Sequence, residues 1–187
     1  KLDACLFNHF MLEREDHTTI PNYQNIYQLF ISCNIKLEQP HDMLEWTWIH
    51  MAVNAAVISV AGKHGDITNS SEAARRLMNS VSLLKNVIKV IRETTKIVAS
   101  RGVTLSKYYN ELWFYKVPAC LSARFMKRMF ARNQLTRRIM ELHGDTADLL
   151  YICNSVYQTG TTAHVPAPLF YSYMDEIIKK SDKISGE

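Results

Sequence analysis

Residues 71–101 read SEAARRLMNSVSLLKNVIKVIRETTKIVASR, and this stretch decides the fold class. Its apolar side chains recur at spacings of three, four and seven, the repeat of one face of an α-helix. This stripe consists of Leu77, Val81, Leu84, Ile88, Ile91 and Val98. Gly102 follows, and glycine often ends a helix in a left-handed conformation. We therefore predict one long helix over 71–101, ended by Gly102.

Further helices are predicted on both sides of this stretch. Asp42 followed by Glu45 resembles a capping box, so a helix should begin there and stop at Gly62. Helical segments are also expected at about 106–116, 119–142, 146–159 and 168–180. Pro118, Gly144 and a loop over 160–168 separate them. A chain with this pattern is mainly α.

The N-terminal part has a different pattern. Residues 4–12 have the aromatic and apolar content of a strand, a helix should follow Pro21-Asn22, and residues 35–37 should be extended. A self-contained sheet needs more strands than two. We therefore divide the chain into residues 1–40, a linker strand and helix left from a nucleotide-binding domain, and residues 41–187, a helical domain.

Composition sets the broad class. The 187 residues are 47% hydrophobic and carry a formal net charge of +4, an ordinary globular balance. No stretch has the length and apolarity of a membrane span, and the N-terminus has no signal-peptide pattern. Cys5, Cys33, Cys120 and Cys153 are far apart, which predicts packed, reduced thiols, no metal site and a cytoplasmic location.

The glycines exclude two phosphate-binding motifs. They stand at positions 62, 65, 102, 144, 160 and 186, and neither GxGxxG nor GxxxxGK[ST] can be built from them. This chain alone is not expected to hold a dinucleotide.

The helix that begins near Asp42 contains a polar pair on an apolar face. Trp46, His50, Asn54 and Val57 fall on one side at helical spacing. Buried polar groups need hydrogen-bond partners. His50 and Asn54 are therefore either satisfied core residues, bonded to each other or to neighbours, or part of a site that faces a cleft.

Two later segments leave similar alternatives open. Either Asp145 or Asp148 caps a helix start, or Asp148 is a buried carboxylate in a substrate pocket. The basic run is either a solvated helix face, a phosphate contact to a cofactor held elsewhere, or a nucleic-acid patch. It comprises Arg124, Lys127, Arg128, Arg132, Arg137 and Arg138.

The order of these parts resembles the ketopantoate reductases (2-dehydropantoate 2-reductases), over nearly the whole chain. Residues 48–54, WIHMAVN, are similar to the family's W-x-K-x-x-x-N, and Gly65-Asp66-Ile67 is similar to its Gly-Glu-Leu. The stretch Ala99–Val103, ASRGV, matches the end of the family's long helix. Later in the chain, Thr136 stands at the family's Ser, Asp148 at its Glu and Pro168 at its Pro.

The resemblance implies a fold, a function and a site. The fold is the 6-phosphogluconate-dehydrogenase-C-terminal-like helical type, here a divergent member. The function is substrate binding and dimerisation in an NADP-dependent reductase of a 2-oxo acid or ketone. The family's catalytic Lys is replaced by His50, and Asn54, Thr136 and Asp148 take the substrate-binding places. Histidine, with an ordinary pKa of about 6.5, can act as a general acid.

The implied partners follow from this function. They are the small-molecule substrate, the chain's own N-terminal Rossmann domain, which binds most of the NADP, and a second copy in a homodimer. Neither a nucleic acid nor a membrane is expected. Without its cofactor domain the chain should be inactive. The alternative is a non-catalytic helical oligomerisation or interaction domain, with the helix over 71–101 as the partner surface.

Overall fold

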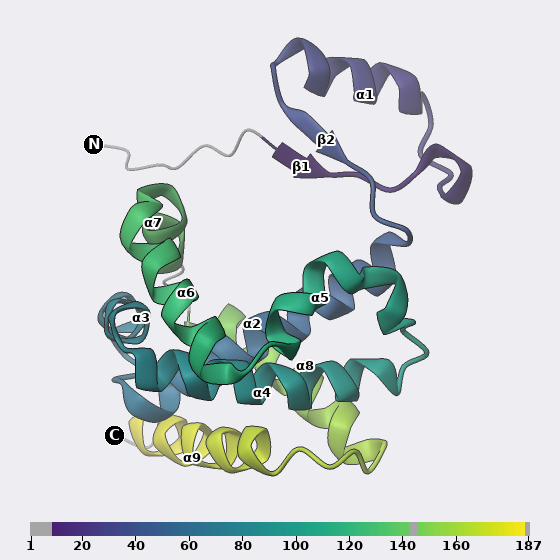
Figure 1. Cartoon of the computed structure of the whole chain (residues 1–187). Coiled ribbons are helices and arrows are strands. Elements are labelled where there is room, and N and C mark those ends of the chain that lie inside the picture. The colour runs from purple at the N-terminus through teal and green to yellow at the C-terminus, as the bar shows by residue number, and fades with distance from the viewer. Residues whose placement is uncertain (1–8, 143–145, 186–187) are drawn as a thin grey trace. The chain divides into compact units, whose positions relative to one another are not determined.

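The computed structural model describes residues 9–142 and 146–185, which are mainly helical with one small two-stranded sheet (Figure 1). The sheet and its helix come first: β1 (His9–Met11), α1 (Tyr23–Ser32) and β2 (Lys36–Glu38). The remaining helices are α2 (Met43–His64), α3 (Ser70–Asn79), α4 (Val81–Ala99), α5 (Tyr109–Lys116), α6 (Ala119–Arg132), α7 (Gln134–Leu142), α8 (Thr146–Thr162) and α9 (Pro168–Ser185). The mainly helical class predicted from the sequence is confirmed.

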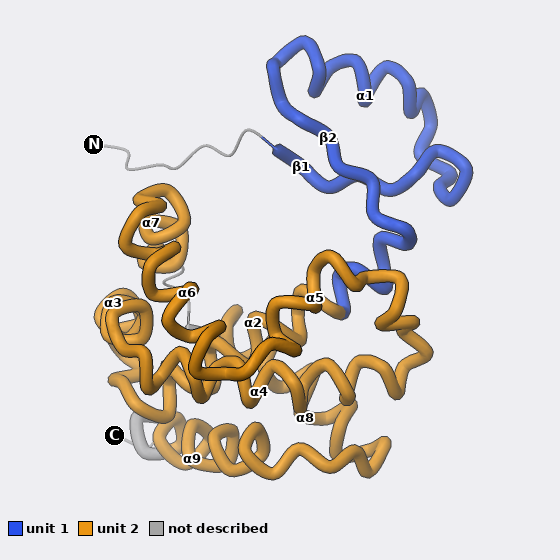
Figure 2. The backbone as a smooth tube through the Cα atoms, viewed as in Figure 1, with its two compact units in different colours: residues 1–48 blue, residues 49–187 orange. Residues whose placement is uncertain are grey.

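The chain divides into two compact units, Lys1–Trp48 and Ile49–Glu187 (Figure 2). The sequence predicts a division between residues 40 and 41, just before α2. The boundary between the two compact units lies between Trp48 and Ile49, within that helix. Residues 4–8 of the predicted strand, with Cys5, lie outside the described residues.

The first unit contains a strand–helix–strand segment. Strands β1 and β2 are parallel, with Phe10 opposite Leu37. Helix α1 connects them, and its Phe30 ring stacks on Phe10 of β1 with the ring centroids 5.0 Å apart. Parallel neighbouring strands require such a crossover connection. The strand, helix and extended segment predicted in this region are therefore present.

The predicted start of α2 is confirmed by its cap. The Asp42 carboxylate accepts a hydrogen bond from the Glu45 backbone N–H at 2.8 Å. The Met43 N–H donates to the Glu13 carboxylate at 2.9 Å, so a second of the free N–H groups at this helix end is satisfied. The helix continues past the predicted stop at Gly62 and ends at His64.

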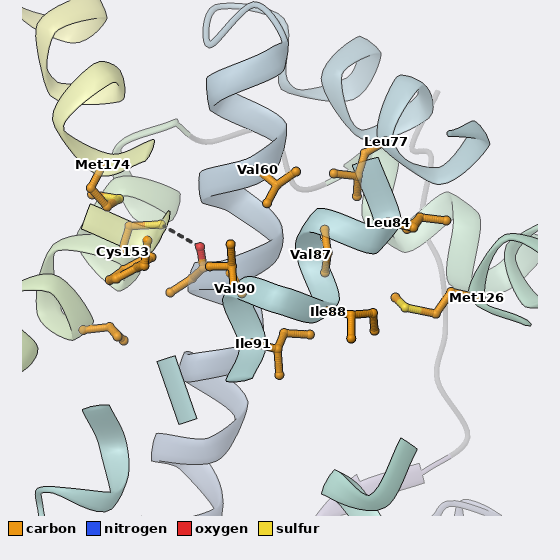
Figure 3. Packing of buried hydrophobic residues seen from close by; sticks show 14 of the residues in the cluster. Val60, Leu77, Leu84, Val87, Ile88, Val90, Ile91, Met126, Cys153 and Met174 are labelled. Carbon is orange, nitrogen blue, oxygen red and sulfur yellow. Dashed lines mark hydrogen bonds between the residues drawn. The ribbon is translucent and has the colours of Figure 1, made fainter. Parts of the chain in front are cut away.

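Helix α4 lies at the centre of the second unit and packs against α3, α5, α6, α8 and α9 (Figure 1). Its side chains Leu84, Val87, Ile88 and Ile91 are fully buried, and Figure 3 shows them facing side chains of the surrounding helices. Each such side chain stabilises the fold by about 1.5–3 kcal/mol relative to exposure. The apolar stripe of 71–101 thus lies in the centre of the core.

Two polar contacts inside this core tie helices together. The Thr94 hydroxyl of α4 donates to the Ala52 carbonyl of α2 at 2.8 Å. The Cys153 thiol of α8 lies 3.7 Å from the Ala55 carbonyl, also on α2 (Figure 3). Burial raises the pKa of Cys153 to about 12, so this thiol stays protonated. It is the packed thiol that the sequence predicted, whereas Cys33 and Cys120 are exposed and that prediction is wrong for them.

Two helices predicted as continuous are each broken in two. The helix over 71–101 is divided at Ser80, whose extended backbone (φ −110°, ψ 110°) ends α3 and whose hydroxyl accepts from the Leu83 N–H to begin α4. The helix over 119–142 is divided at Asn133, whose side chain accepts from the Thr136 N–H at 3.0 Å. Serine and asparagine favour such cap positions because their side chains replace a missing backbone acceptor. Gly102 has φ 91°, as predicted for a helix-ending glycine.

Within the described ranges, no helix combines the length and apolarity needed to cross a membrane.

Candidate functional site

The four residues predicted to form a site lie on three helices of the second unit. His50 and Asn54 are on α2, Thr136 is on α7 and Asp148 is in the first turn of α8. Asn54 is half-buried and lines a partly open cavity. His50 and Asp148 are exposed, so neither the expected position of His50 within an apolar stripe nor a buried Asp148 carboxylate is found.

Thr136 is half-buried, and its backbone N–H donates to the Asn133 side chain, which caps the start of α7. Asp145, the other acidic residue considered for the start of α8, lies outside the described residues. Of the predicted four, Asn54 alone is among the residues that line the cavity. Helices α7 and α8 contribute to the lining through Met140, one turn after Thr136, and through Leu149, next to Asp148.

The cavity is lined by residues of α2, α3, α7, α8 and α9, is partly open to solvent and has a volume of about 140 Å³. Its walls come from core-facing aliphatic side chains, including Ile58, Leu77, Leu150 and Ile177. The turn between α2 and α3 closes one side. A Cβ atom on Gly65 would lie 2.7 Å from the Ala73 Cβ, so the turn approaches α3 as closely as glycine permits.

Three of the lining residues have polar side chains: Asn54, Asp66 and Ser70. Asp66 accepts hydrogen bonds from the Thr68 hydroxyl at 2.7 Å and from the Thr68 N–H at 2.9 Å. These bonds lower the pKa of Asp66, so its carboxylate is ionised at neutral pH. The sequence does not predict Asp66 or Ser70 as site residues, although Gly65-Asp66-Ile67 is similar to a ketopantoate reductase motif.

A lysine next to this turn, Lys180, has all three donors of its ammonium group in hydrogen bonds. The Lys180 ammonium of α9 donates to the carbonyls of Gly62, Lys63 and Gly65 at 2.8, 3.0 and 3.2 Å. An ammonium group has three donors, and a cation at a helix C-terminus is favoured by the helix dipole. Lys180 therefore caps α2 and has no donor left for a ligand. Lys63 beside it forms an ion pair with Glu176.

The described residues include neither a glycine-containing turn after β1 nor a cluster of metal-binding side chains. The connection from β1 to α1 spans residues 12–22 and contains no glycine, so the backbone cannot approach a pyrophosphate there as it does in a Rossmann turn. Among the residues that the structure describes, no group of three His, Cys, Asp or Glu side chains could hold a metal.

The fold and the cavity together define a mainly helical unit with a mostly apolar, partly open cavity whose described wall includes the amide of Asn54. Comparison of the chain with protein-family models, with curated proteins and with solved structures finds no match.

Proposed function

We propose that the second unit is the substrate-binding and dimerisation domain of an NADP-dependent reductase of 2-oxo acids or ketones, similar to the ketopantoate reductases and of their helical fold type. The observation that carries the proposal is the position of Asn54, the residue matched to a family substrate-binding Asn, at the wall of the cavity. In this proposal Asn54 donates a hydrogen bond from its amide to an oxygen of the substrate.

The parallel strand–helix–strand segment of the first unit supports the proposal, because βαβ units are the building blocks of nucleotide-binding sheets. The chain contains no glycine-rich phosphate-binding motif for the cofactor. In this proposal the chain therefore binds the substrate, and a Rossmann domain binds NADP. His50 is the proposed proton donor to the substrate carbonyl, with Thr136 and Asp148 as further substrate contacts.

Binding tests this function directly. Isothermal titration of the chain with small 2-oxo acids and ketones should give saturable binding, and Asn54→Ala should weaken it about tenfold, since a hydrogen bond to a ligand contributes about 1–1.5 kcal/mol. Asn110→Ala, an exposed position on α5, is the matched control and should bind like the parent. Equal affinity in all three proteins would show that Asn54 does not contact the ligand, and the proposed function would be rejected.

A second candidate, a non-catalytic interaction domain, is favoured by the outer face of α6. Leu121, Phe125 and Met129 lie one turn apart and are 52%, 61% and 36% exposed. The basic residues Arg124, Lys127, Arg128 and Arg132 are exposed on the same helix, and α6 has no acidic residue. These four residues of the predicted basic run form a solvated face that is interleaved with apolar side chains, whereas Arg137 on α7 is half-buried and pairs with Glu141.

This face fits an acidic peptide segment with an apolar anchor. Phe125, Arg128, Met129 and Arg132 line one open depression, so an apolar side chain and two carboxylates could bind there together. Exchanging Arg128 and Arg132 for Glu should abolish binding of an acidic amphipathic peptide, measured by fluorescence anisotropy. Exchanging the exposed Lys85 and Lys89 of α4 for Glu should not. Unchanged binding in the arginine variant would reject this candidate.

A further inference from the structure

Among the described residues that line the cavity beside Asn54 there is no Lys, Arg or His. The one charged residue among these described residues is Asp66, and the hydrogen bonds from Thr68 keep that carboxylate ionised. The nearest turn is capped by Lys180, whose three donors are all bonded to backbone carbonyls. A ligand carboxylate entering this cavity would lose water and gain no counter-charge, which is strongly unfavourable.

Two neutral polar groups remain available. Within the described residues, neither the Asn54 carboxamide nor the Ser70 hydroxyl makes a side-chain hydrogen bond, although both residues are half-buried at the cavity. An amide offers N–H donors and a hydroxyl one O–H donor, which suit a carbonyl or alcohol oxygen. A polar group at an apolar wall without a partner is the usual orienting element of a small-molecule site.

The rest of the wall is aliphatic. Ala61 and Ala74 are small, Val57 and Ile152 are branched, and Met140 is flexible, so an alkyl group of matching shape would contact mostly carbon atoms. The volume of about 140 Å³ sets the size. An apolar cavity of about 150 Å³ can hold a molecule as large as benzene.

We propose that this cavity binds a small uncharged aliphatic ligand with one carbonyl or hydroxyl oxygen directed at Asn54. The inference rests on the proposed function and narrows it: the preferred substrate is a neutral branched ketone or ketoester, because the described lining residues offer no cation to the carboxylate of a 2-oxo acid. The proposed site is Asn54 and Ser70 for the oxygen, with Val57, Ala74, Met140 and Ile177 around the alkyl group.

A matched set of ligands tests the charge requirement. The probes are 3-methyl-2-oxobutanoate, its uncharged methyl ester and 3-methyl-2-butanone, which share the branched alkyl group and the ketone. The readout is the NMR signal of the Met140 methyl group in chain labelled with ¹³C-methyl methionine, assigned with Met140→Leu. Met129, exposed on α6, provides an internal control signal.

The ester and the ketone should shift the Met140 signal saturably, while the acid should need at least about tenfold higher concentration, equivalent to 1.4 kcal/mol. Asn54→Lys places a cation at the wall and should reverse the preference in favour of the acid. Ala74→Leu fills the cavity and should weaken both ligands, while Asn110→Ala should change neither.

The outcomes separate the two proposals. Tighter binding of the acid than of the ester in the parent chain, with loss in Asn54→Ala, would overturn the charge requirement and leave the proposed function standing. A Met140 signal that no probe moves would overturn both. An ester that binds equally well to Asn54→Ala would overturn the role of the amide.

Discussion

The hydroxyl of Thr94 on α4 donates a hydrogen bond of 2.8 Å to the backbone carbonyl of Ala52 on α2, and both residues are fully buried. Helix α2 is the helix that carries Asn54, two residues after Ala52. A single buried hydroxyl therefore joins the central helix of the core to the helix that forms one wall of the cavity.

Replacing Thr94 by Val should destabilise the chain by about 1 kcal/mol, because the shape is kept and the interhelical hydrogen bond is lost. Urea unfolding followed by circular dichroism measures this difference. Thr95→Val is the control, since the Thr95 hydroxyl bonds to Ile91 of its own helix and to no other helix. Equal losses in the two variants would show that the contact with Ala52 contributes nothing.

Arg92 of α4 is expected to hold the end of α5. Its guanidinium donates to the carbonyls of Tyr115 and Val117 at 2.7 and 2.6 Å. Arg92→Met should cost about 2–3 kcal/mol, because hydrogen bonds from a charged donor are the stronger ones. Amide hydrogen exchange over 109–117 should accelerate. Lys89→Met, at an exposed site of the same helix, should leave these rates unchanged.

Gly160 of α8 is expected to tolerate no side chain. A Cβ atom there would lie 2.5 Å from the Tyr171 hydroxyl and 2.7 Å from the Ile97 Cδ1. The Tyr171 hydroxyl cannot easily move, because it donates to the Val165 carbonyl at 2.7 Å. Gly160→Ala should therefore destabilise by about 1–3 kcal/mol through overpacking.

A different glycine provides the comparison for this substitution. Gly102 has φ 91° and open space around it, so Gly102→Ala should cost about 1–2 kcal/mol of backbone strain alone. Adding Tyr171→Phe should relieve part of the cost at Gly160 and none of the cost at Gly102. Strictly additive losses in the Gly160 double variant, measured by thermal unfolding, would contradict the steric explanation.

His64, the last residue of α2, is expected to make stability depend on pH. Burial lowers its pKa, and the positive charges of Lys63, Arg76 and Lys180 lower it further, while Glu176 opposes them. Its Nε2 atom is buried and has no hydrogen-bond partner among the described residues, and its ring meets the Tyr173 ring edge-on with the centroids 5.8 Å apart. The folded state thus favours the neutral ring.

The sign follows from the lowered pKa. The unfolded chain takes up a proton near the ordinary histidine pKa of about 6.5 and the folded chain takes it up at lower pH, so stability is lost as the pH falls below about 6.5. The melting temperature of His64→Gln should therefore fall less between pH 7.5 and pH 5.5 than that of the parent. His41→Gln, at an exposed site, should keep the parent slope. A steeper slope in His64→Gln would reverse the assignment.

Local sequence signals located most elements. The Asp42 cap, the helix after Pro21-Asn22 and the left-handed Gly102 were all predicted from a few adjacent residues, because each depends on backbone hydrogen bonding within one turn. The breaks at Ser80 and Asn133 were missed, since the apolar repeat runs on across both positions. Serine and asparagine can also lie inside a continuous helix. The packing of α3 and α7 on their neighbours decides whether the helix continues through Ser80 and Asn133 or ends there.

The sequence by itself determined that this protein is mainly helical and that Asn54 lies among apolar residues, because periodicity and caps are properties of neighbouring residues. Only the tertiary structure decided that α4 is the centre of the core, that His50 and Asp148 are exposed, and that Asn54 shares a cavity with Asp66 and Ser70. The physical reason is that a cavity wall is assembled from several helices far apart in the chain. Its charge and shape therefore depend on how those helices pack against one another.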